Sequence, residues 1–377
     1  MTRSLRLALV AAVLAVGLVA AVPPSSTGPI VNGWIAFRAD RTGNPEIFVI
    51  RPDGSQPTNL TNHPADDSAP SWSGDGTRVA FVSRRDGNDE IYVMNADGTG
   101  QTRLTNDPGF DQWPAFSPDG TKIAFRSNRD GDSEIYVMNA DGTNPTNLTD
   151  DPSTDTEPAW SPDGTKIAFG SDRDGGGHVF VMNASDGSNP TNITTAIGGG
   201  GNPDWSPDGT RIVMISDLGI DDNEVVVIGT DGSSPVNLTN NEDTEYDPHW
   251  SPDGTRITYE CEDPVSGNLQ ICVMNADGSA QTTISNQDDS EPAWQPVPVP
   301  PLKVQKDRVK EGKKSKVFVE LATPAVGTIP VTFKAVSGTA KRGKDFKPST
   351  GTIVFAPGES FKVVRVKTRE DAREERH

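Results

Sequence analysis

Short apolar triplets alternate with polar turns along most of the chain. The triplet reads Ile-Ala-Phe or a close variant, and it returns at intervals of 44 or 45 residues. The six copies begin at Ile35, Val79, Ile123, Ile167, Ile212 and Ile257. Short alternating runs bounded by Gly and Pro are typical of β-strands. The pattern therefore predicts an all-β unit that is repeated six times.

An aromatic residue followed by a Ser-Pro-Asp-Gly-Thr turn, or a variant of it, marks the same point of each repeat. These aromatics are Trp72, Phe116, Trp160, Trp205, Trp250 and Trp294, spaced 44, 44, 45, 45 and 44 residues apart. In the third unit we expect strands at 114–116, 122–126, 134–138 and 146–149, separated by Gly-containing turns. Four strands in a period of this length predict a six-bladed β-propeller.

The ends of the repeat array predict how the ring closes. The first unit begins at its second strand, whereas a lone first-strand phrase, Glu291-Pro292-Ala293-Trp294, follows the sixth fourth strand. We expect this late strand to complete the first blade, which would remove an exposed sheet edge. The predicted propeller spans residues 33–295.

The repeat resembles the TolB-type, WD-repeat-like propeller family. The resemblance is carried by Pro-Ala-Trp-Ser-Pro-Asp-Gly-Thr-Lys-Ile-Ala-Phe from Pro158 and by Glu-Ile-Tyr-Val-Met-Asn-Ala-Asp-Gly-Thr from Glu134, and it runs from Gly33 to Gln295. It implies a fold rather than one particular activity, because propellers carry many functions.

Composition changes after the propeller. Residues 296–301 are rich in Pro and predict a semi-rigid linker. From Leu302 onward the chain has 18 Lys and Arg against 9 Asp and Glu, whereas the preceding part has 16 against 44. An acidic ring is thus joined to a basic C-terminal segment. The acidic ring argues against nucleic acid, which needs a positive footprint.

Residues 302–377 resemble a Calx-beta domain, an immunoglobulin-like β-sandwich. The matching phrases include Val309-Lys310-Glu311-Gly312, Gly343-Lys344-Asp345-Phe346 and the run from Gly351 to Glu359. We expect strands at 316–321, 329–336, 351–355 and 360–368, and a small sandwich that is incomplete at its C-terminus. In calcium-binding members of the family, acidic side chains at one end hold the ions. The matching positions are Glu311, Asp345, Glu370, Asp371 and Glu375. The resemblance therefore implies Ca²⁺ as a ligand, with solvated loop carboxylates as the alternative.

The first 21 residues have the pattern of a signal peptide. Arg3 and Arg6 precede an apolar run that ends in small residues suited to cleavage after Ala21. We expect export to the periplasm, the cell surface or the medium, with no transmembrane segment after cleavage. A retained membrane anchor is the alternative.

Cys261 and Cys272 are the two cysteines of the chain, and they flank the loop between the second and third strands of the sixth unit. They align with Ser127 and Tyr136 of the third unit, which we expect to face each other across a hairpin. In an exported protein this arrangement predicts a disulfide; a pair of small core thiols is the alternative.

Two sets of charged residues recur at fixed positions, which favours a structural role. The arginines are Arg41, Arg85, Arg129 and Arg173, and the glutamates are Glu46, Glu90, Glu134 and Glu224. We expect them to form ion pairs with each other or to satisfy backbone groups.

Six positions directly before the first-strand Pro differ between repeats. In ring order they are Ala69, Trp113, Glu157, Asn202, Asp247 and Glu291. Because first strands line the channel of a propeller, we expect these side chains to crowd one mouth of it. The predicted binding residues are Glu157, Asn202, Asp247 and Glu291 facing Trp113, with Asp204 and His249 close behind. Clustered carboxylates repel unless a cation or ligand offsets them; a hydrated funnel is the alternative.

Catalytic motifs of common hydrolases are missing from the sequence, and His249 with Asp204 has no obvious nucleophile beside it. The sequence therefore favours a non-enzymatic, monomeric, exported binding or scaffold protein for a protein, peptide or glycan ligand. The alternative is an extracellular hydrolase or lyase that acts on polysaccharide or peptide at the channel mouth.

Overall fold

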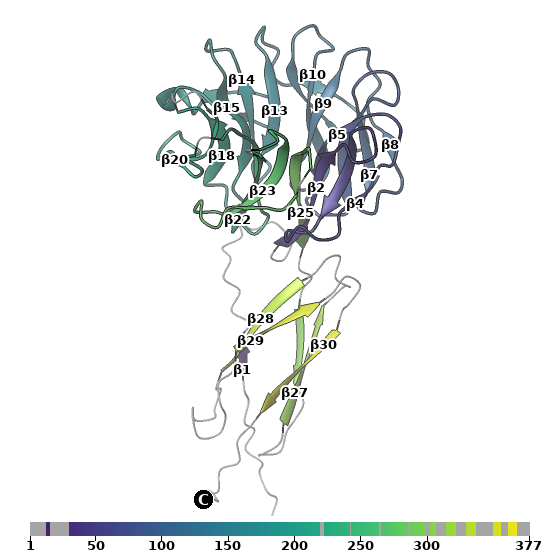
Figure 1. Cartoon of the computed structure of the whole chain (residues 1–377), viewed down its shortest axis with the longest axis vertical. Coiled ribbons are helices and arrows are strands. Elements are labelled where there is room, and N and C mark those ends of the chain that lie inside the picture. The colour runs from purple at the N-terminus through teal and green to yellow at the C-terminus, as the bar shows by residue number, and fades with distance from the viewer. Residues whose placement is uncertain are drawn as a thin grey trace, which may run out of the picture. The chain divides into compact units, whose positions relative to one another are not determined.

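The computed structural model describes eleven segments of the chain. They are residues 13–15, 30–218, 222–241, 243–263, 265–285, 287–298, 302–306, 314–321, 329–336, 350–355 and 361–367. The chain divides into two compact units, one containing Ile30–Pro298 and the other containing Val299–His377 (Figure 1). The predicted signal peptide, residues 1–21, lies outside the described residues apart from the short strand β1 (Val13–Ala15).

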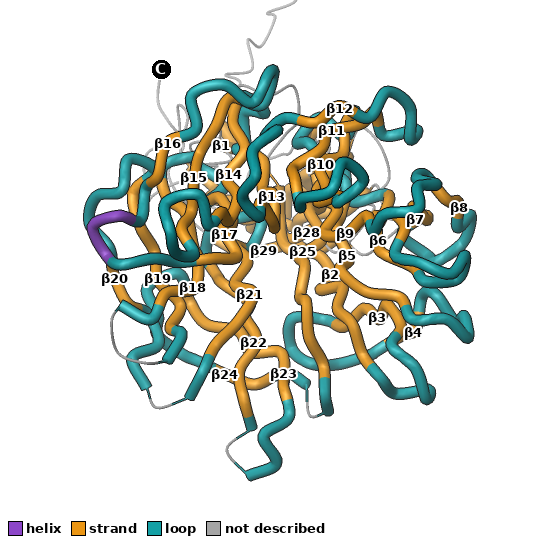
Figure 2. Tube along the Cα trace, turned by 90° about the horizontal axis from the view of Figure 1, so that it is seen from above, coloured by secondary structure: helices purple, strands orange, loops and turns teal. Residues whose placement is uncertain are grey.

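Within Ile30–Pro298, six antiparallel sheets of four strands surround a common centre (Figure 2). Blade 1 consists of β25 (Asp289–Pro298), β2 (Ile30–Ala39), β3 (Glu46–Ile50) and β4 (Thr58–Asn59). Blade 2 consists of β5 (Asp67–Trp72), β6 (Arg78–Ser83), β7 (Glu90–Asn95) and β8 (Thr102–Arg103). Blade 3 consists of β9 (Asp111–Phe116), β10 (Lys122–Ser127), β11 (Glu134–Asn139) and β12 (Thr146–Asn147).

The remaining blades follow the same order. Blade 4 consists of β13 (Asp155–Trp160), β14 (Lys166–Ser171), β15 (His178–Asn183) and β16 (Thr191–Asn192). Blade 5 consists of β17 (Gly201–Trp205), β18 (Arg211–Ser216), β19 (Glu224–Gly229) and β20 (Val236–Asn237). Blade 6 consists of β21 (Glu245–Trp250), β22 (Arg256–Glu262), β23 (Leu269–Asn275) and β24 (Thr282–Thr283). A 3₁₀ turn, η1 (Thr195–Ile197), links blades 4 and 5. The prediction of a six-bladed, all-β propeller is confirmed.

Ring closure follows the predicted scheme. Strand β25 pairs antiparallel with β2, from Ile30 opposite Pro298 to Ala39 opposite Asp289. The first blade is thus built from both ends of the repeat array. Its core continues into blade 6, because Phe37 and Ile50 pack in one cluster with Ile271.

Apolar clusters join each blade to the next and make up the core. The Phe or Met of the second-strand triplet is fully buried in five blades, at Phe37, Phe81, Phe125, Phe169 and Met214. Between blades 2 and 3, for example, Val82 and Ile91 pack against Phe116 and Phe125. Stability therefore comes from interfaces between neighbouring blades, as expected for a repeat architecture.

The recurrent arginines do not pair with the recurrent glutamates, so that part of the prediction is wrong. Each arginine instead binds a fully buried aspartate at the start of the first strand of its own blade. The pairs are Arg41 with Asp289, Arg85 with Asp67, Arg129 with Asp111 and Arg173 with Asp155. Each guanidinium also lies over two aromatic rings, as Arg129 does over Phe125 and Tyr136. The sequence analysis missed the aspartate because it lies 18 residues or more from its arginine, in the first strand of the blade.

The recurrent glutamates satisfy backbone and hydroxyl groups, which confirms the other part of that prediction. Glu90, for example, accepts hydrogen bonds from the Thr105 hydroxyl and the Asp107 N–H. Glu46 binds Thr61 and His63 in the same way. The glutamate thereby holds the end of the fourth strand in place.

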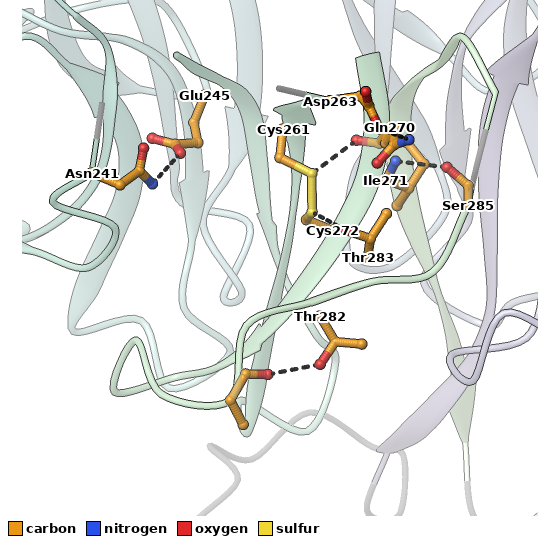
Figure 3. Close-up of a disulfide and its surroundings, with 11 residues drawn as sticks. Asn241, Glu245, Cys261, Asp263, Gln270, Ile271, Cys272, Thr282, Thr283 and Ser285 are labelled. Atoms are coloured by element: carbon orange, nitrogen blue, oxygen red, sulfur yellow. Dashed lines mark hydrogen bonds between the residues drawn. A yellow bond between two sulfur atoms is a disulfide. The ribbon is translucent and has the colours of Figure 1, made fainter. Parts of the chain in front are cut away.

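Blade 6 carries a disulfide between Cys261 and Cys272, with their Cα atoms 5.9 Å apart (Figure 3). The expectation that the two positions face each other directly is wrong. Cys261 lies opposite Gln270 and Cys272 opposite Tyr259, so the disulfide crosses the hairpin diagonally. Two residues beyond Cys261, blade 6 has Asp263 where blades 1 to 4 have the arginine. We call the arginine–aspartate pair of blades 1 to 4 the arginine clamp. The disulfide therefore ties the hairpin of a blade that lacks this clamp.

The second unit contains five strands of the C-terminal segment. They are β26 (Leu302–Lys306), β27 (Lys314–Leu321), β28 (Ile329–Val336), β29 (Thr350–Phe355) and β30 (Phe361–Lys367). Two three-stranded sheets result, with the orders β26-β27-β30 and β1-β28-β29. The four strands that the sequence predicted here are all present within one or two residues.

A chain that ends at Ser285 should melt well below one that ends at Pro298. It loses β25, so that the first strand of blade 1 and the buried Trp294 are missing. Since about 1 kcal/mol shifts the midpoint of a domain of this size by roughly 2–4 °C, losing a whole strand should lower it by more than about 10 °C. Differential scanning calorimetry measures the midpoints. Equal melting of the two chains would contradict the closure.

Candidate functional site

A β-bulge in the first strand of every blade sets the geometry of the channel mouth. In blade 3 the pairing register of β9 with β10 shifts between Ala124 and Arg126. The bulged residue has a positive φ in each blade, which is unusual for residues other than Gly. These residues are Ala69, Trp113, Glu157, Asn202, Asp247 and Glu291, with φ between 46° and 56°. They are the six positions at which the sequence predicted a crowded mouth.

The six bulged residues line one cavity of about 260 Å³. Asp204 and His249 line the same cavity, as do the first-strand aromatics Trp72, Trp250 and Trp294. The structure thus brings together all seven residues that the sequence proposed for the mouth. That they bind a ligand stays a prediction.

Several of the mouth carboxylates bind backbone N–H groups of a neighbouring strand. Glu157 Oε2 accepts a hydrogen bond of 3.0 Å from the Asn202 N–H, and Glu291 Oε2 accepts one of 2.5 Å from the Ala69 N–H. Both donors belong to the bulged residue of the next blade. A bulge leaves its residue outside the ladder, and a buried N–H needs a partner. These carboxylates therefore also stabilise the ring.

His249 lies between two aspartates at the centre of the acidic arc. Its Nδ1 is 3.7 Å from Asp204 Oδ2, and its Nε2 is 3.5 Å from Asp247 Oδ1. Burial opposes the charged form, but the two carboxylates outweigh it and raise the pKa of His249 to about 10. The ring is therefore an imidazolium at neutral pH. It neutralises one of the two aspartates and leaves a net negative charge.

Three glutamates at the mouth hold their protons unusually tightly. Burial, followed by the Asp247 charge, raises the pKa of Glu157 to about 7. Burial also raises the pKa of Glu291 to about 7, and that of Glu260 to about 8. The Asp247 carboxylate opposes the ionisation of all three. Asp247 is thus the charge that acts on all three glutamates.

A second set of variable residues, which the sequence analysis missed, lies beside the first. It is the fifth residue of the second-strand pattern: Arg38, Val82, Arg126, Gly170, Ile215 and Glu260. Glu260 Oε1 accepts a hydrogen bond from the Glu291 N–H. The Arg126 guanidinium lies 5.1 Å from the centre of the Trp113 ring. Variation at an otherwise repeated strand position was the signal that could have found this set.

Metal ligation is not evident at the mouth. Among the described residues, no group of three or more His, Cys, Asp or Glu side chains is arranged to hold a metal ion. The five positions proposed for calcium, Glu311, Asp345, Glu370, Asp371 and Glu375, lie outside the described residues. Nor does the described part of the chain contain a helix long and apolar enough to cross a membrane.

Comparisons with known proteins agree with the fold. The family described as TolB beta propeller domain matches residues 32–108 and 99–298, and the Calx-beta domain matches residues 301–377. TolB from Acinetobacter baumannii is 24% identical with a TM-score of 0.63; the match covers 70% of this chain and 66% of that protein, just under two thirds of its length. Putative TolB from Agrobacterium tumefaciens is 24% identical with a TM-score of 0.55, covering 68% of this chain and 89% of that one.

A more distant likeness comes from a chain of a nidogen/laminin complex. It is 12% identical with a TM-score of 0.56, and the match covers 70% of this chain and 98% of that chain. No curated protein matches the sequence.

Fold and mouth together define a six-bladed propeller whose channel opens among carboxylates. The chain belongs to the TolB β-propeller domain family, and a Calx-beta domain follows the propeller. The resemblances noted in the sequence are thereby confirmed.

The Glu157→Gln, Glu291→Gln double variant should be more stable than the natural protein at pH 8. Folding raises the pKa of each glutamate from 4.5 to about 7, so the folded state binds more protons than the unfolded state between these pH values. The free energy of unfolding therefore falls as the pH rises through this window. Each glutamine can still accept the N–H bond but has no charge, so it should recover on the order of 2 kcal/mol at pH 8. Urea unfolding at pH 4.5 and pH 8 measures the difference. A natural protein that gains stability between these pH values relative to the variant would contradict the assignment.

Proposed function

We propose that the protein is a non-enzymatic binding protein outside the cytoplasm, and that its channel mouth takes the cationic group of a peptide or protein partner. The observation that carries the proposal is the convergence of Glu157, Asp247 and Glu291 from three blades on one cavity. The imidazolium of His249 lies near both Asp204 and Asp247, so it offsets only one of these two negative charges. A partner's ammonium group that entered the cavity would offset the remaining charge.

The size of the cavity favours one side chain as the bound group. About 260 Å³ is less than the volume of a typical small-molecule site and would hold a lysine side chain or a chain terminus. Displacing protons from glutamates with raised pKa values would couple binding to pH. Attraction to the acidic ring would hasten the encounter with a basic partner.

The alternative function, a hydrolase or lyase, is less well supported by the same residues. As an imidazolium, His249 cannot act as a general base at neutral pH. Ser71 lines the cavity, and the group its hydroxyl bonds is the Phe116 N–H, a donor that cannot act as a base. These contacts favour binding over catalysis.

An extracytoplasmic location is part of the proposal. The disulfide of blade 6 and the signal-peptide pattern of residues 1–21 both favour an oxidising compartment. Mass spectrometry of the protein recovered from its host would show the cleavage after Ala21 that we propose.

Isothermal titration calorimetry with a blocked tetralysine peptide tests the mouth. We expect binding that weakens with added salt, and none with blocked tetraglutamine. The triple variant Glu157→Gln, Asp247→Asn, Glu291→Gln should keep its circular dichroism spectrum and lose affinity at least about ten-fold, because it removes the charges that face the ligand.

A charge-matched control separates the mouth from the general acidity of the ring. Asp53, Asp97 and Asp141 lie in exposed turns, where each uses Oδ1 to accept turn hydrogen bonds that an asparagine can also accept. Changing all three to Asn removes at least as much negative charge, because Glu157 and Glu291 are partly protonated near neutral pH, and should alter affinity less than about two-fold. Equal losses in both triple variants would reject the mouth as the binding site.

For the Calx-beta domain we propose Ca²⁺ binding, as its resemblance implies. Ca²⁺ at about 1 to 10 mM, above the dissociation constants of about 0.1–1 mM found for weak extracellular modules, should raise the melting point of the full chain. Replacing Glu311 by Gln and Asp345 by Asn should abolish the rise, whereas the Asp53, Asp97 and Asp141 variant should retain it. An unchanged melting point in the natural protein would reject the proposal.

A further inference from the structure

Neighbouring blades are bridged at two junctions by an arginine side chain. The bridging residue is the first residue of a second strand. Arg78 of blade 2 lies 5.1 Å from the Phe116 ring centre of blade 3 and donates a hydrogen bond of 3.0 Å to the Gly120 carbonyl. Arg211 of blade 5 lies 4.8 Å from the Trp250 ring centre of blade 6. The aromatic that ends the next first strand is thus a platform for a guanidinium.

The junction between blades 4 and 5 has an aromatic residue, Trp205, at the end of the first strand but no arginine at the start of the preceding second strand. Lys166 stands at the position of Arg78 and Arg211, and its ammonium binds Asn183 of its own blade at 2.6 Å. A cavity of about 600 Å³ lies at this junction. Trp205 and Gly209, the counterparts of Phe116 and Gly120, both line it.

The walls of this cavity carry three carboxylates against one ammonium, that of Lys166. Asp163 and Asp208 lie in the turns of the two blades, and Asp231 lies beside them. Burial opposes ionisation at Asp163 and Asp208, but hydroxyl and N–H donors in the turns outweigh it and lower the pKa of both carboxyls. The turn bonds of Asp163 and Asp208 use Oδ1. Oδ2 of each takes no part in these turn bonds.

We propose that the cavity between blades 4 and 5 is a second binding site, and that it takes the guanidinium group of an arginine side chain from a protein partner. Trp205 is 8% exposed, so the arginine would contact the part of the ring that lines the cavity and would donate to the Gly209 carbonyl, as Arg78 contacts Phe116 and donates to Gly120. Asp163 and Asp208 supply the compensating charge. The site is separate from the channel mouth, and it does not rest on the function proposed for the mouth.

A guanidinium fits this site better than an ammonium. It is planar, stacks on aromatic faces, and can donate to a carbonyl and a carboxylate at the same time. Lys166 illustrates the difference, because it lines the cavity but its ammonium binds the Asn183 amide oxygen of its own blade. The volume of about 600 Å³ also leaves room for the backbone that carries the side chain.

The test follows the indole N–H signal of Trp205 in the full chain by two-dimensional NMR during titration with blocked arginine, N-acetyl-arginine methylamide. We expect a saturable shift of this signal. The corresponding blocked lysine should bind at least about five-fold more weakly. A Trp205→Phe variant identifies the signal. Equal affinity for both amino acids would overturn the proposal.

Variants at Lys166 provide the sharpest comparison. Lys166→Arg should abolish the response, because a tethered guanidinium would occupy the platform as Arg78 and Arg211 do. Lys122→Arg makes the same change one blade earlier and should leave the response intact. Asp208→Asn, which keeps its turn oxygen, should weaken it. An undiminished response in Lys166→Arg together with Asp208→Asn would overturn the proposal.

One more variant separates the two sites. The triple mouth variant Glu157→Gln, Asp247→Asn, Glu291→Gln should retain the Trp205 response. If it lost this response while Lys166→Arg kept it, arginine would be binding at the mouth, and the second site would be rejected. If the triple mouth variant lost tetralysine binding but kept the Trp205 response, the second site would be supported independently of the mouth.

Discussion

The bulge in each first strand is the constraint on which the channel mouth depends. It places one non-glycine residue per blade in the left-handed region, at a cost of about 1–2 kcal/mol each. Apolar packing between blades offsets that cost, because each second-strand core residue is buried against a neighbour. In return, six side chains are held at one cavity by backbone geometry rather than by flexible loops. Substitutions at these six positions can change the chemistry of the cavity while the backbone of the ring stays the same.

Charge and structure are coupled at this mouth. Glu157 and Glu291 bind the N–H of the next bulge, so the same carboxylates that repel one another also satisfy backbone groups. Each carboxylate must be buried to reach the backbone N–H that it binds, and burial disfavours its charged form. This is the main reason why the pKa values of Glu157 and Glu291 are raised. The hydrated funnel and the binding site are therefore not exclusive. A partner's cation would add to an arrangement that the ring already requires.

The sequence predicted strands, blade number and closure because each rests on local, periodic signals. The phrase Glu291 to Trp294 could belong only to an unfinished blade, and it does. Pairings across the fold were harder. Arg129 binds Asp111, which lies 18 residues earlier, and the intervening strand hides the relation. The Cys261 disulfide was assigned to the correct partner but not to the correct register, because a hairpin alignment does not distinguish opposite from diagonal positions.

Departures from the repeat are most marked in blades 5 and 6, and this bears on function. Blades 1 to 4 share the arginine clamp, whereas blade 5 has Leu218 at that position and blade 6 has Asp263 beside its disulfide. Blade 6 also has Glu245 at the position where blades 1 to 4 pair an aspartate with arginine, and burial raises the pKa of Glu245 to about 7. In blade 6 the disulfide ties the hairpin that the arginine stabilises elsewhere, and in blade 5 Leu218 packs against the core between blades 4 and 5. Asn202, Asp204, Asp247 and His249 of the mouth come from these two blades, as does Trp205 of the second proposed site, whereas Glu157 and Glu291 come from the neighbouring blades 4 and 1. The blades that depart most from the repeat thus supply most of the residues on which both proposals rest.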